Sequence, residues 1–200
     1  MQKKVISKKI KHDQNIAEIK FGEFLTALGF DWKNDDNMKD TPKRVAKMYC
    51  KEIFNGVYDK APDVTNFENE SGYTGIVFQG DIEVKSMCSH HFMPFIGKAF
   101  VGYIPNKEGK IIGLSKLNRI VEYYSRRPQL QERLTKQIHD EINSLTESNL
   151  GVAVYIECKH MCVSHRGVCH NSVMKTIFTS GVFIENENLA RSEFLAMIKN

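Results

Sequence analysis

Apolar residues change their spacing along the chain, from a helical period near the N-terminus to an alternating one further on. Between residues 12 and 28 they recur every three or four positions, which predicts an amphipathic helix that ends at Gly29. A second helix is expected from Thr41-Pro42, where an N-cap threonine precedes a proline, to about Phe54. Asn55-Gly56 is expected to close this helix.

In the rest of the chain, β-branched and aromatic residues alternate with polar ones, which predicts strands. The first strand region runs from about Tyr73 to the Cys88 segment, with a break near Gln79-Gly80-Asp81. Helical spacing returns in three places. The further strands expected are residues 98–104, 152–157 and 173–184, the last as one strand or a pair, and the helices are residues 115–124 with Ser115 as N-cap, about 128–145, and 189–198.

These strands and helices do not alternate regularly, so the expected fold class is α+β rather than a doubly wound parallel sheet. We expect three parts: a basic tail over residues 1–11, a helical portion over residues 12–70 and a mixed domain over residues 71–200. No internal repeat or low-complexity segment is visible in the sequence.

Composition narrows the classes of partner. The 200 residues are 42% hydrophobic, which is enough for a proper core. Lys and Arg outnumber Asp and Glu by 28 to 24, and this net charge of +4 is too small to indicate nucleic-acid binding but fits a small polyanionic substrate. No stretch is apolar enough to span a membrane, and residues 1–11 lack the apolar run of a secretory signal.

The cysteines number five, and no export signal accompanies them. An odd count without a signal does not favour a disulfide framework. Metal or thiol chemistry in a reducing, cytoplasmic compartment is the better expectation.

Residues suited to bind a metal ion gather in two short segments, Cys88-Ser89-His90-His91 and His160-Met161-Cys162. A turn can bring Cys88 and His91 to one ion, whereas the adjacent His90 and His91 cannot both face it in most backbone conformations. Zinc favours thiolate and imidazole, with four protein ligands in a structural site and three in a catalytic one. The spacing leaves both forms open, and the second would free His90 and His160 for acid–base chemistry.

A second group of residues is suited to hold a nucleotide. Ser115-Lys116 and Arg119 open a predicted helix, whose free N–H groups and partial positive charge favour phosphate. Arg166, four residues after Cys162, offers a guanidinium for bidentate contact with the same anion. Gln131-Glu132 open the long helix, and an amide beside a carboxylate suits the edge of guanine. The ordinary alternatives are a cationic helix surface and a glutamate favoured by the helix dipole.

Several longer motifs resemble those of type I GTP cyclohydrolase, in order from about residue 12 to the C-terminus. Many separate motifs in one order are more specific than a single short pattern. Ser89 departs from the family, which usually has glutamate there, and His165 matches no position we can assign. The matching segments are Thr41–Met48, Ser86–Phe92, Gly102–Pro105, Gly113–Arg119, Arg127–Thr135, His160–Cys162 and Arg166-Gly167.

The resemblance implies a tunnelling fold, in which an antiparallel sheet carries helices on one face and is preceded by N-terminal helices. It implies a homodecamer of two stacked pentameric rings, with sites at subunit interfaces. It also implies one Zn²⁺ per subunit, held by Cys88, His91 and Cys162 with water in the fourth position. The other implied roles are acid–base catalysis by His90 and His160 with Ser115, guanine binding by Gln131 and Glu132, and triphosphate binding by Ser115, Lys116, Arg119 and Arg166, joined by Arg44 and Lys47.

The activity that the resemblance implies is conversion of GTP and water to formate and 7,8-dihydroneopterin triphosphate, the first step of tetrahydrofolate and pterin biosynthesis. Neither a nucleic acid nor a membrane is expected as a partner. The combined zinc, Ser-Lys and Gln-Glu motifs argue against a pterin-handling synthase or a nitrile reductase of the same fold class. A structural zinc module that binds a nucleotide without turnover is the alternative from a different class.

Overall fold

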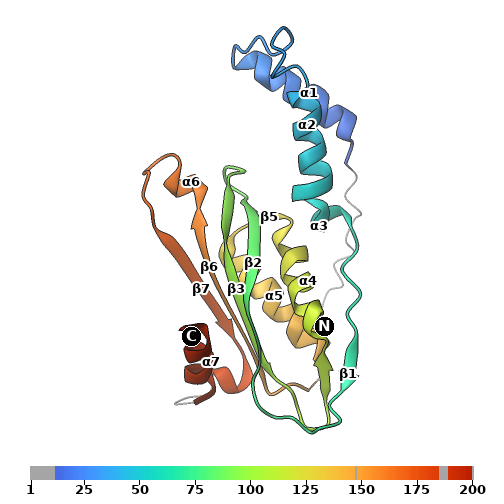
Figure 1. Ribbon diagram of the computed structural model, residues 1–200, viewed down its shortest axis with the longest axis vertical. Helices are drawn as coiled ribbons and strands as arrows, with labels where there is room; N and C mark the ends of the chain where they lie inside the picture. Colours follow the sequence, from blue (N-terminus) through green and yellow to red (C-terminus); the bar gives the residue numbers. More distant parts are fainter. Residues whose placement is uncertain (1–11, 147, 185–188, 200) are drawn as a thin grey trace, which may run out of the picture. The chain divides into compact units, whose positions relative to one another are not determined.

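The computed structural model describes residues 12–146, 148–184 and 189–199 (Figure 1). The chain folds as two compact units, Met1–Lys60 and Ala61–Asn200. The basic tail expected over residues 1–11 lies outside the described residues.

The N-terminal unit is helical, as the hydrophobic spacing predicts. Asp13 caps its first helix, because the Asp13 carboxylate accepts hydrogen bonds from the main-chain N–H groups of Asn15 and Ile16 at 2.9 and 3.1 Å. Gly22 allows the indole of Trp32 to pack closely, since a Cβ there would lie 2.8 Å from the ring. The elements are α1 (Gln14–Ala27), α2 (Thr41–Met48), a π-helical segment η1 (Tyr49–Ile53) and α3 (Asn55–Tyr58).

The predicted ends of the second helix need two corrections. Thr41 lies inside α2 rather than capping it, and Asp40 occupies the N-cap position without a side-chain cap bond. Asn55 and Gly56 do not close the helical region, because they begin the short helix α3 after η1.

The buried faces of this unit also differ from the predicted ones. Of the apolar face expected on α1, Leu25 is buried while Ile16, Ile19, Phe24 and Leu28 are each more than half exposed. The stripe expected on the second helix was Val45, Met48, Tyr49 and Ile53, all of which are only half-buried. The buried side chains there are spaced by four residues and are Pro42, Ala46, Cys50 and Phe54.

The second unit is built on a five-stranded sheet in the order β5-β2-β3-β6-β7. All neighbouring pairs are antiparallel except the short parallel pair of β2 with β5. A separate antiparallel pair joins β1 and β4. The strands are β1 (Asn66–Glu68), β2 (Val77–Cys88), β3 (Pro94–Ile104), β4 (Lys110–Ile112), β5 (Pro128–Gln129), β6 (Gly151–His160) and β7 (Val173–Thr179).

Helices cover both faces of this sheet, which corrects the expectation of helices on one face only. Leu117 of α4 (Leu114–Ser125) and Leu134 of α5 (Gln131–Leu145) pack with Val84 and Val154 in the larger hydrophobic core. Phe194 of α7 (Leu189–Lys199) belongs to a smaller hydrophobic cluster. The strand residues of this cluster alternate with those of the larger core, so they point to the opposite face of the sheet. Figure 1 shows α7 on the side of the sheet away from α4 and α5. The fold class is α+β, as predicted.

Several element ends differ from the sequence prediction. Gly113, not Ser115, is the N-cap of α4, so Ser115 lies within the first turn. The helix expected from about residue 128 begins at Gln131, because Pro128–Gln129 pairs with β2 as a strand. Residues 173–184 form the single strand β7 followed by a 3₁₀ turn, η2 (Gly181–Phe183). The break predicted near residues 79–81 is confirmed by a register shift between Gln79 and Ile82.

Two strands on either side of β3 end at the same edge of the sheet and bring together the two segments singled out in the sequence. β2 and β6 are both antiparallel to β3, so both run toward the same edge of the unit. β2 ends at Cys88, and β6 ends at His160 opposite Phe95 of β3. Gly97 permits this close pairing, because a Cβ at that position would collide with the main-chain oxygen of Glu157.

Candidate metal centre

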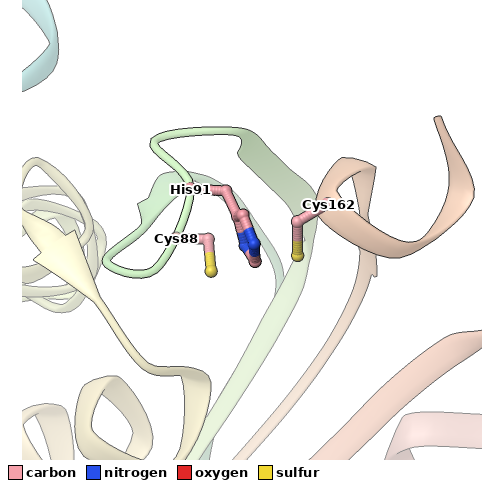
Figure 2. Close-up of side chains that lie close together, drawn as sticks. All are labelled: Cys88, His91 and Cys162. Atoms are coloured by element: carbon pink, nitrogen blue, oxygen red, sulfur yellow. The ribbon is translucent and has the colours of Figure 1, made fainter. Parts of the chain in front are cut away.

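Three side chains from the two segments converge on one point, Cys88, His91 and Cys162 (Figure 2). One ligand atom from each lies within 4.8 Å of the other two. Cys88 is buried, Cys162 is half-buried and His91 is exposed. The two sulfur ligands therefore lie on the more buried side of the group, and the imidazole lies at the surface.

Local hydrogen bonds place each of the three residues. A tight turn after β2 carries His91, with the N–H of Phe92 donating to the Cys88 carbonyl and the N–H of Cys88 to the Met93 carbonyl, both at 2.9 Å. Phe92 has a left-handed backbone with φ of 50°, which reverses the chain into β3. Cys162 does not continue β6 as a strand residue, since it lies in the single helical turn α6 (Met161–Ser164).

The donor set fits a zinc ion. Zinc binds thiolate at about 2.3 Å and imidazole nitrogen at about 2.0 Å, so its ligand atoms lie roughly 3.5 Å apart in a tetrahedron. The three atoms, within 4.8 Å of one another, need only a small contraction to reach that spacing. Burial, and next the neighbouring Cys88 thiol, raise the pKa of Cys162 above its ordinary value. A metal cation that replaces the two thiol protons would offset the cost of ionising two neighbouring thiols.

Cys158 has a different environment, although sequence alternation places it on one face with His160 and Cys162. Its thiol is 1% exposed and belongs to the hydrophobic core. Burial raises the pKa of Cys158 to about 12, so the thiol stays protonated at neutral pH. Cys158 lies outside the Cys–His–Cys group.

The adjacent histidines diverge. The rings of His90 and His91 are 6.4 Å apart and nearly perpendicular, at 82°. His90 is exposed and lies outside the Cys–His–Cys group. Arg166 approaches the group from the other segment, with its Nη1 donating to Nε2 of His91 at 3.1 Å.

His160 lies between a flat aromatic surface and a buried amide. Its ring stacks on Phe95 with centroids 4.6 Å apart and planes inclined by 6°. Nε2 of His160 lies 2.8 Å from Oε1 of Gln131. Burial lowers the pKa of His160, and the Glu132 carboxylate opposes this shift. The imidazole is therefore held in place and close to a negative charge.

Gln131 and Glu132 do not share an environment, although they adjoin in sequence. Consecutive helical residues point about 100° apart, so the first turn of α5 sends the two side chains in different directions. Gln131 is 1% exposed, and its amide faces the interior. Glu132 is exposed and open to a ligand.

Arg133 ties the turn that carries His91 to the start of α5. Its guanidinium donates to Oε1 of Gln129 at 2.9 Å, to the Pro128 carbonyl at 2.6 Å and to Oγ of Ser89 at 3.2 Å. The N–H of Ser89 also donates to the Gln129 carbonyl at 2.9 Å. Ser89, where the family usually has glutamate, thus takes part in positioning the turn.

Within one chain, the residues expected to bind phosphate at the start of α4 do not lie beside the Cys88–His91 and His160–Cys162 segments. α4 has 12 residues, and a helix of that length extends roughly 17 Å at its usual rise. Its C-terminal end leads to β5, which pairs with Cys88, so Ser115 and Lys116 lie in the first turn at the far end and Arg119 lies midway along the helix. Nζ of Lys116 donates to the Asp63 carbonyl at 2.7 Å.

Arg44 and Lys47 belong to the N-terminal unit. Both are exposed on α2, and Arg44 lies 3.5 Å from the Asp40 carboxylate. Their predicted part in triphosphate binding stays a prediction.

No role is predicted from the sequence for Arg133, Gln129 or Phe95. Arg133 and Gln129 are four residues apart where a strand residue precedes a helix, a spacing that allows side-chain contact, and both fall inside one of the motifs quoted above. Phe95 carries no signal of this kind, because an aromatic residue in a strand is ordinarily a core residue.

Comparison with known proteins agrees with the motifs. The chain matches the family GTP cyclohydrolase I over residues 17–199. A relative named GTP cyclohydrolase 1 from Streptomyces avermitilis is 48% identical over 156 residues, covering 78% of this chain and 76% of the relative. One of the same name from Shewanella denitrificans is 42% identical over 193 residues, covering 96% and 85%. A solved structure, archaeosine synthase QueF-Like in the apo form, is similar at 16% identity and a TM-score of 0.44, over 54% of this chain and 94% of that chain.

Fold and site together define an α+β protein with a Cys–His–Cys group able to hold a metal ion. The chain belongs to the GTP cyclohydrolase I family and is an enzyme of that class.

Replacing one sulfur of the group tests its role. We expect Cys162→Ser to lower zinc affinity by more than about 100-fold, because losing a direct ligand should exceed the 10–100-fold cost of losing an outer-shell partner. Cys169→Ser and His90→Ala are matched controls outside the group and should retain one zinc per chain. Zinc per chain after dialysis and chelator competition give the answer. Equal retention by Cys162→Ser and Cys169→Ser would exclude Cys162 as a ligand.

The tie from Arg133 generates a second prediction. Arg133→Leu removes three donated hydrogen bonds and should weaken zinc binding about 10- to 100-fold by loosening the turn. Ser89→Glu offers the guanidinium a carboxylate and should retain the affinity through a charge-assisted bond. Lys136→Leu, a control that removes a cation paired with Asp140 one turn away, should leave it unchanged. Wild-type affinity in Arg133→Leu would show that the tie does not position the ligands.

Proposed function

We propose that the protein is a zinc-dependent hydrolase that converts GTP and water to formate and 7,8-dihydroneopterin triphosphate, the first step of tetrahydrofolate and pterin biosynthesis. The observation that carries this proposal is the Cys88–His91–Cys162 group beside His160, in a chain of the GTP cyclohydrolase I family.

Cys88, His91 and Cys162 would hold one Zn²⁺ per subunit. A zinc ion with three protein ligands supplies Lewis-acid chemistry and lowers the pKa of a water molecule toward neutrality, which makes hydroxide available for attack on C8 of guanine. The exposed imidazole of His91 supports a site open to solvent and substrate on that side.

His160 is proposed as the acid that protonates N7 of guanine while C8 is attacked. Protonation of N7 makes C8 electrophilic and allows the imidazole ring to open. A second hydrolysis releases C8 as formate, and ribose opening, rearrangement and closure of the pterin ring follow. His90 and Ser115 are proposed to move protons in these later steps. The rigid stacking of His160 on Phe95 supports its role, because general acid catalysis needs a fixed donor.

Glu132 is proposed to anchor guanine. A carboxylate accepts hydrogen bonds from the ring and exocyclic N–H groups of the base. Its exposure, and its influence on the pKa of His160, support this role for the carboxylate beside that histidine. Holding the base there would orient C8 for attack.

The triphosphate is proposed to be bound by Ser115, Lys116, Arg119 and Arg166, with Arg44 and Lys47. Arg166 lies at His91, whereas the start of α4 lies at the opposite end of that helix from Cys88. Within one chain, Arg166 and the cationic side chains of α4 therefore lie apart, although both are proposed to contact the same triphosphate. A second copy that presents its own α4 to this site would resolve the separation, which supports a site shared between subunits.

Two unpaired strand edges support assembly into a ring. Among the described residues, no strand pairs with β7 on its outer side or with residues 77–86 of β2 on the side away from β3. A β7 edge placed against the β2 edge of the next copy would repeat head to tail, and a contact of this kind forms a ring when the rotation between copies closes. We propose a tunnelling fold and a homodecamer of two such pentamers.

Charges on the sheet fit the same arrangement. The register aligns Glu83, Lys98, Glu157 and Lys175 in one row across β2, β3, β6 and β7. The row begins with Glu83 at one edge of the sheet and ends with Lys175 at the other. In the proposed arrangement, Lys175 of one copy would face Glu83 of the next copy, so opposite charges would pair. The exposed apolar residues of α1 offer further surface for a partner copy.

Free thiols at all five cysteines support a reducing compartment, and we propose the cytoplasm. Within the described ranges, no helix has the length and apolar character needed to cross a bilayer. Neither a nucleic acid nor a membrane is proposed as a partner.

The proposed reaction is tested by incubating zinc-loaded protein with GTP. We expect formate and, after oxidation and dephosphorylation, fluorescent neopterin, both abolished by a zinc chelator and restored by added zinc. His160→Ala should retain zinc and GTP but lose ring opening by at least about 100-fold, the lower end for a general acid. Zinc-loaded, folded protein that binds GTP and returns it unchanged would favour a nucleotide-binding zinc module instead.

A further inference from the structure

The carboxamide of Gln131 is enclosed by partners inside the second unit. Gln131 is 1% exposed. Its Nε2 lies 3.1 Å from the main-chain oxygens of Ile156 and Met174 and from Oγ1 of Thr176. Its Oε1 lies 2.8 Å from Nε2 of His160. The amide thus joins β6, β7 and His160 to the first turn of α5.

These partners fix which way round the amide lies. A main-chain carbonyl can only accept a hydrogen bond, so the atom facing Ile156 and Met174 must be the NH₂ group. With the NH₂ group turned to two carbonyls, the oxygen must face His160. The reversed amide would place an oxygen against two other oxygens in a buried site, which is strongly unfavourable.

The amide oxygen in turn fixes the tautomer of His160. Oε1 can only accept, so Nε2 of His160 carries a proton and donates it. In the neutral ring, Nδ1 is then the unprotonated nitrogen. Within the described ranges of the chain, Nδ1 has no hydrogen-bond partner, which leaves it available to a ligand.

We infer that Gln131 is a positioning residue for His160: it holds the ring against Phe95 and keeps Nε2–H on the amide oxygen, so that Nδ1 is the nitrogen that faces the substrate. As the proposed acid, His160 takes up a proton from water on Nδ1 and then passes that proton to N7 of guanine. The sequence predicts a guanine contact for Gln131. The structure commits every polar atom of this amide to the protein interior. Recognition of the base is then carried by Glu132, and the inference deepens the proposed function, on which its catalytic consequence rests.

The tautomer can be measured on the wild-type protein without any turnover. ¹⁵N-histidine-labelled, zinc-loaded protein is examined by magic-angle-spinning NMR, with His160→Ala identifying the signal among the seven histidines. We expect a pyrrole-like Nε2 and a pyridine-like Nδ1 for His160. The opposite tautomer, or an even mixture, would overturn the inference even if the enzyme hydrolyses GTP.

Variants separate positioning from guanine binding. Gln131→Leu and the isosteric Gln131→Glu should lower kcat about 10- to 100-fold, the usual effect of losing the partner that orients a histidine. The KM for GTP should stay within about threefold for both variants. The His160 tautomer signal should change in Gln131→Leu, which leaves Nε2 without an acceptor. Thr176→Val is the matched control, since it removes one partner of the amide and keeps both carbonyl contacts, so kcat and tautomer should be retained.

Glu132→Gln supplies the contrasting result, a large rise in the KM for GTP. A rise of more than about tenfold in KM for both Gln131 variants, with kcat and the His160 signal unchanged, would assign Gln131 to guanine and overturn the inference. In a His160→Ala background, Gln131→Glu should have no further effect on the residual rate, because the two residues act as one unit. If Gln131→Leu does not fold, the wild-type spectrum and Gln131→Glu decide the question.

Discussion

The candidate site depends on how two buried amides at the junction of β5 and α5 satisfy their hydrogen bonds. Gln129 and Gln131 are each 1% exposed, and a buried amide that lacks partners is costly. The Gln129 side chain meets Tyr124, Gln137 and Arg133, while its main-chain oxygen receives the N–H of Ser89. Gln131 reaches across the sheet to His160. One segment therefore holds both halves of the site.

This constraint explains how ligands 74 residues apart, Cys88 and Cys162, can meet without a dedicated loop. β2 and β6 are fixed on either side of β3, so their ends differ only in the turns that follow. The turn after β2 carries His91, and α6 carries Cys162. The sheet sets the separation, and the amides at the start of α5 set the orientation. The residues proposed to bind the triphosphate from the first half of α4 have no such tie to the Cys–His–Cys group among the described residues.

The sequence predicts this architecture unevenly, for physical reasons. Thiol and imidazole spacing identifies the metal segments, because few other roles need those residue types so close together. The fate of Gln131 could not be predicted, since adjacency to Glu132 suggests one shared ligand while helix geometry turns the two apart. The buried stripe of α2 and η1 falls on Ala46 and Cys50, because apolar residues on both sides leave the buried face undetermined by the sequence. The N-cap at Gly113 was missed, as serine at 115 gives the stronger local signal.

The most direct measurement is the X-ray absorption spectrum at the zinc edge of protein loaded with one zinc per chain. An open three-ligand site predicts two sulfur neighbours at about 2.3 Å and two lighter neighbours at about 2.0–2.1 Å, with outer-shell scattering from a single imidazole. That result would leave one lighter neighbour to solvent, as hydrolysis requires. Two imidazoles, or three or more sulfurs, would describe a closed structural site and contradict a hydrolytic role for the metal.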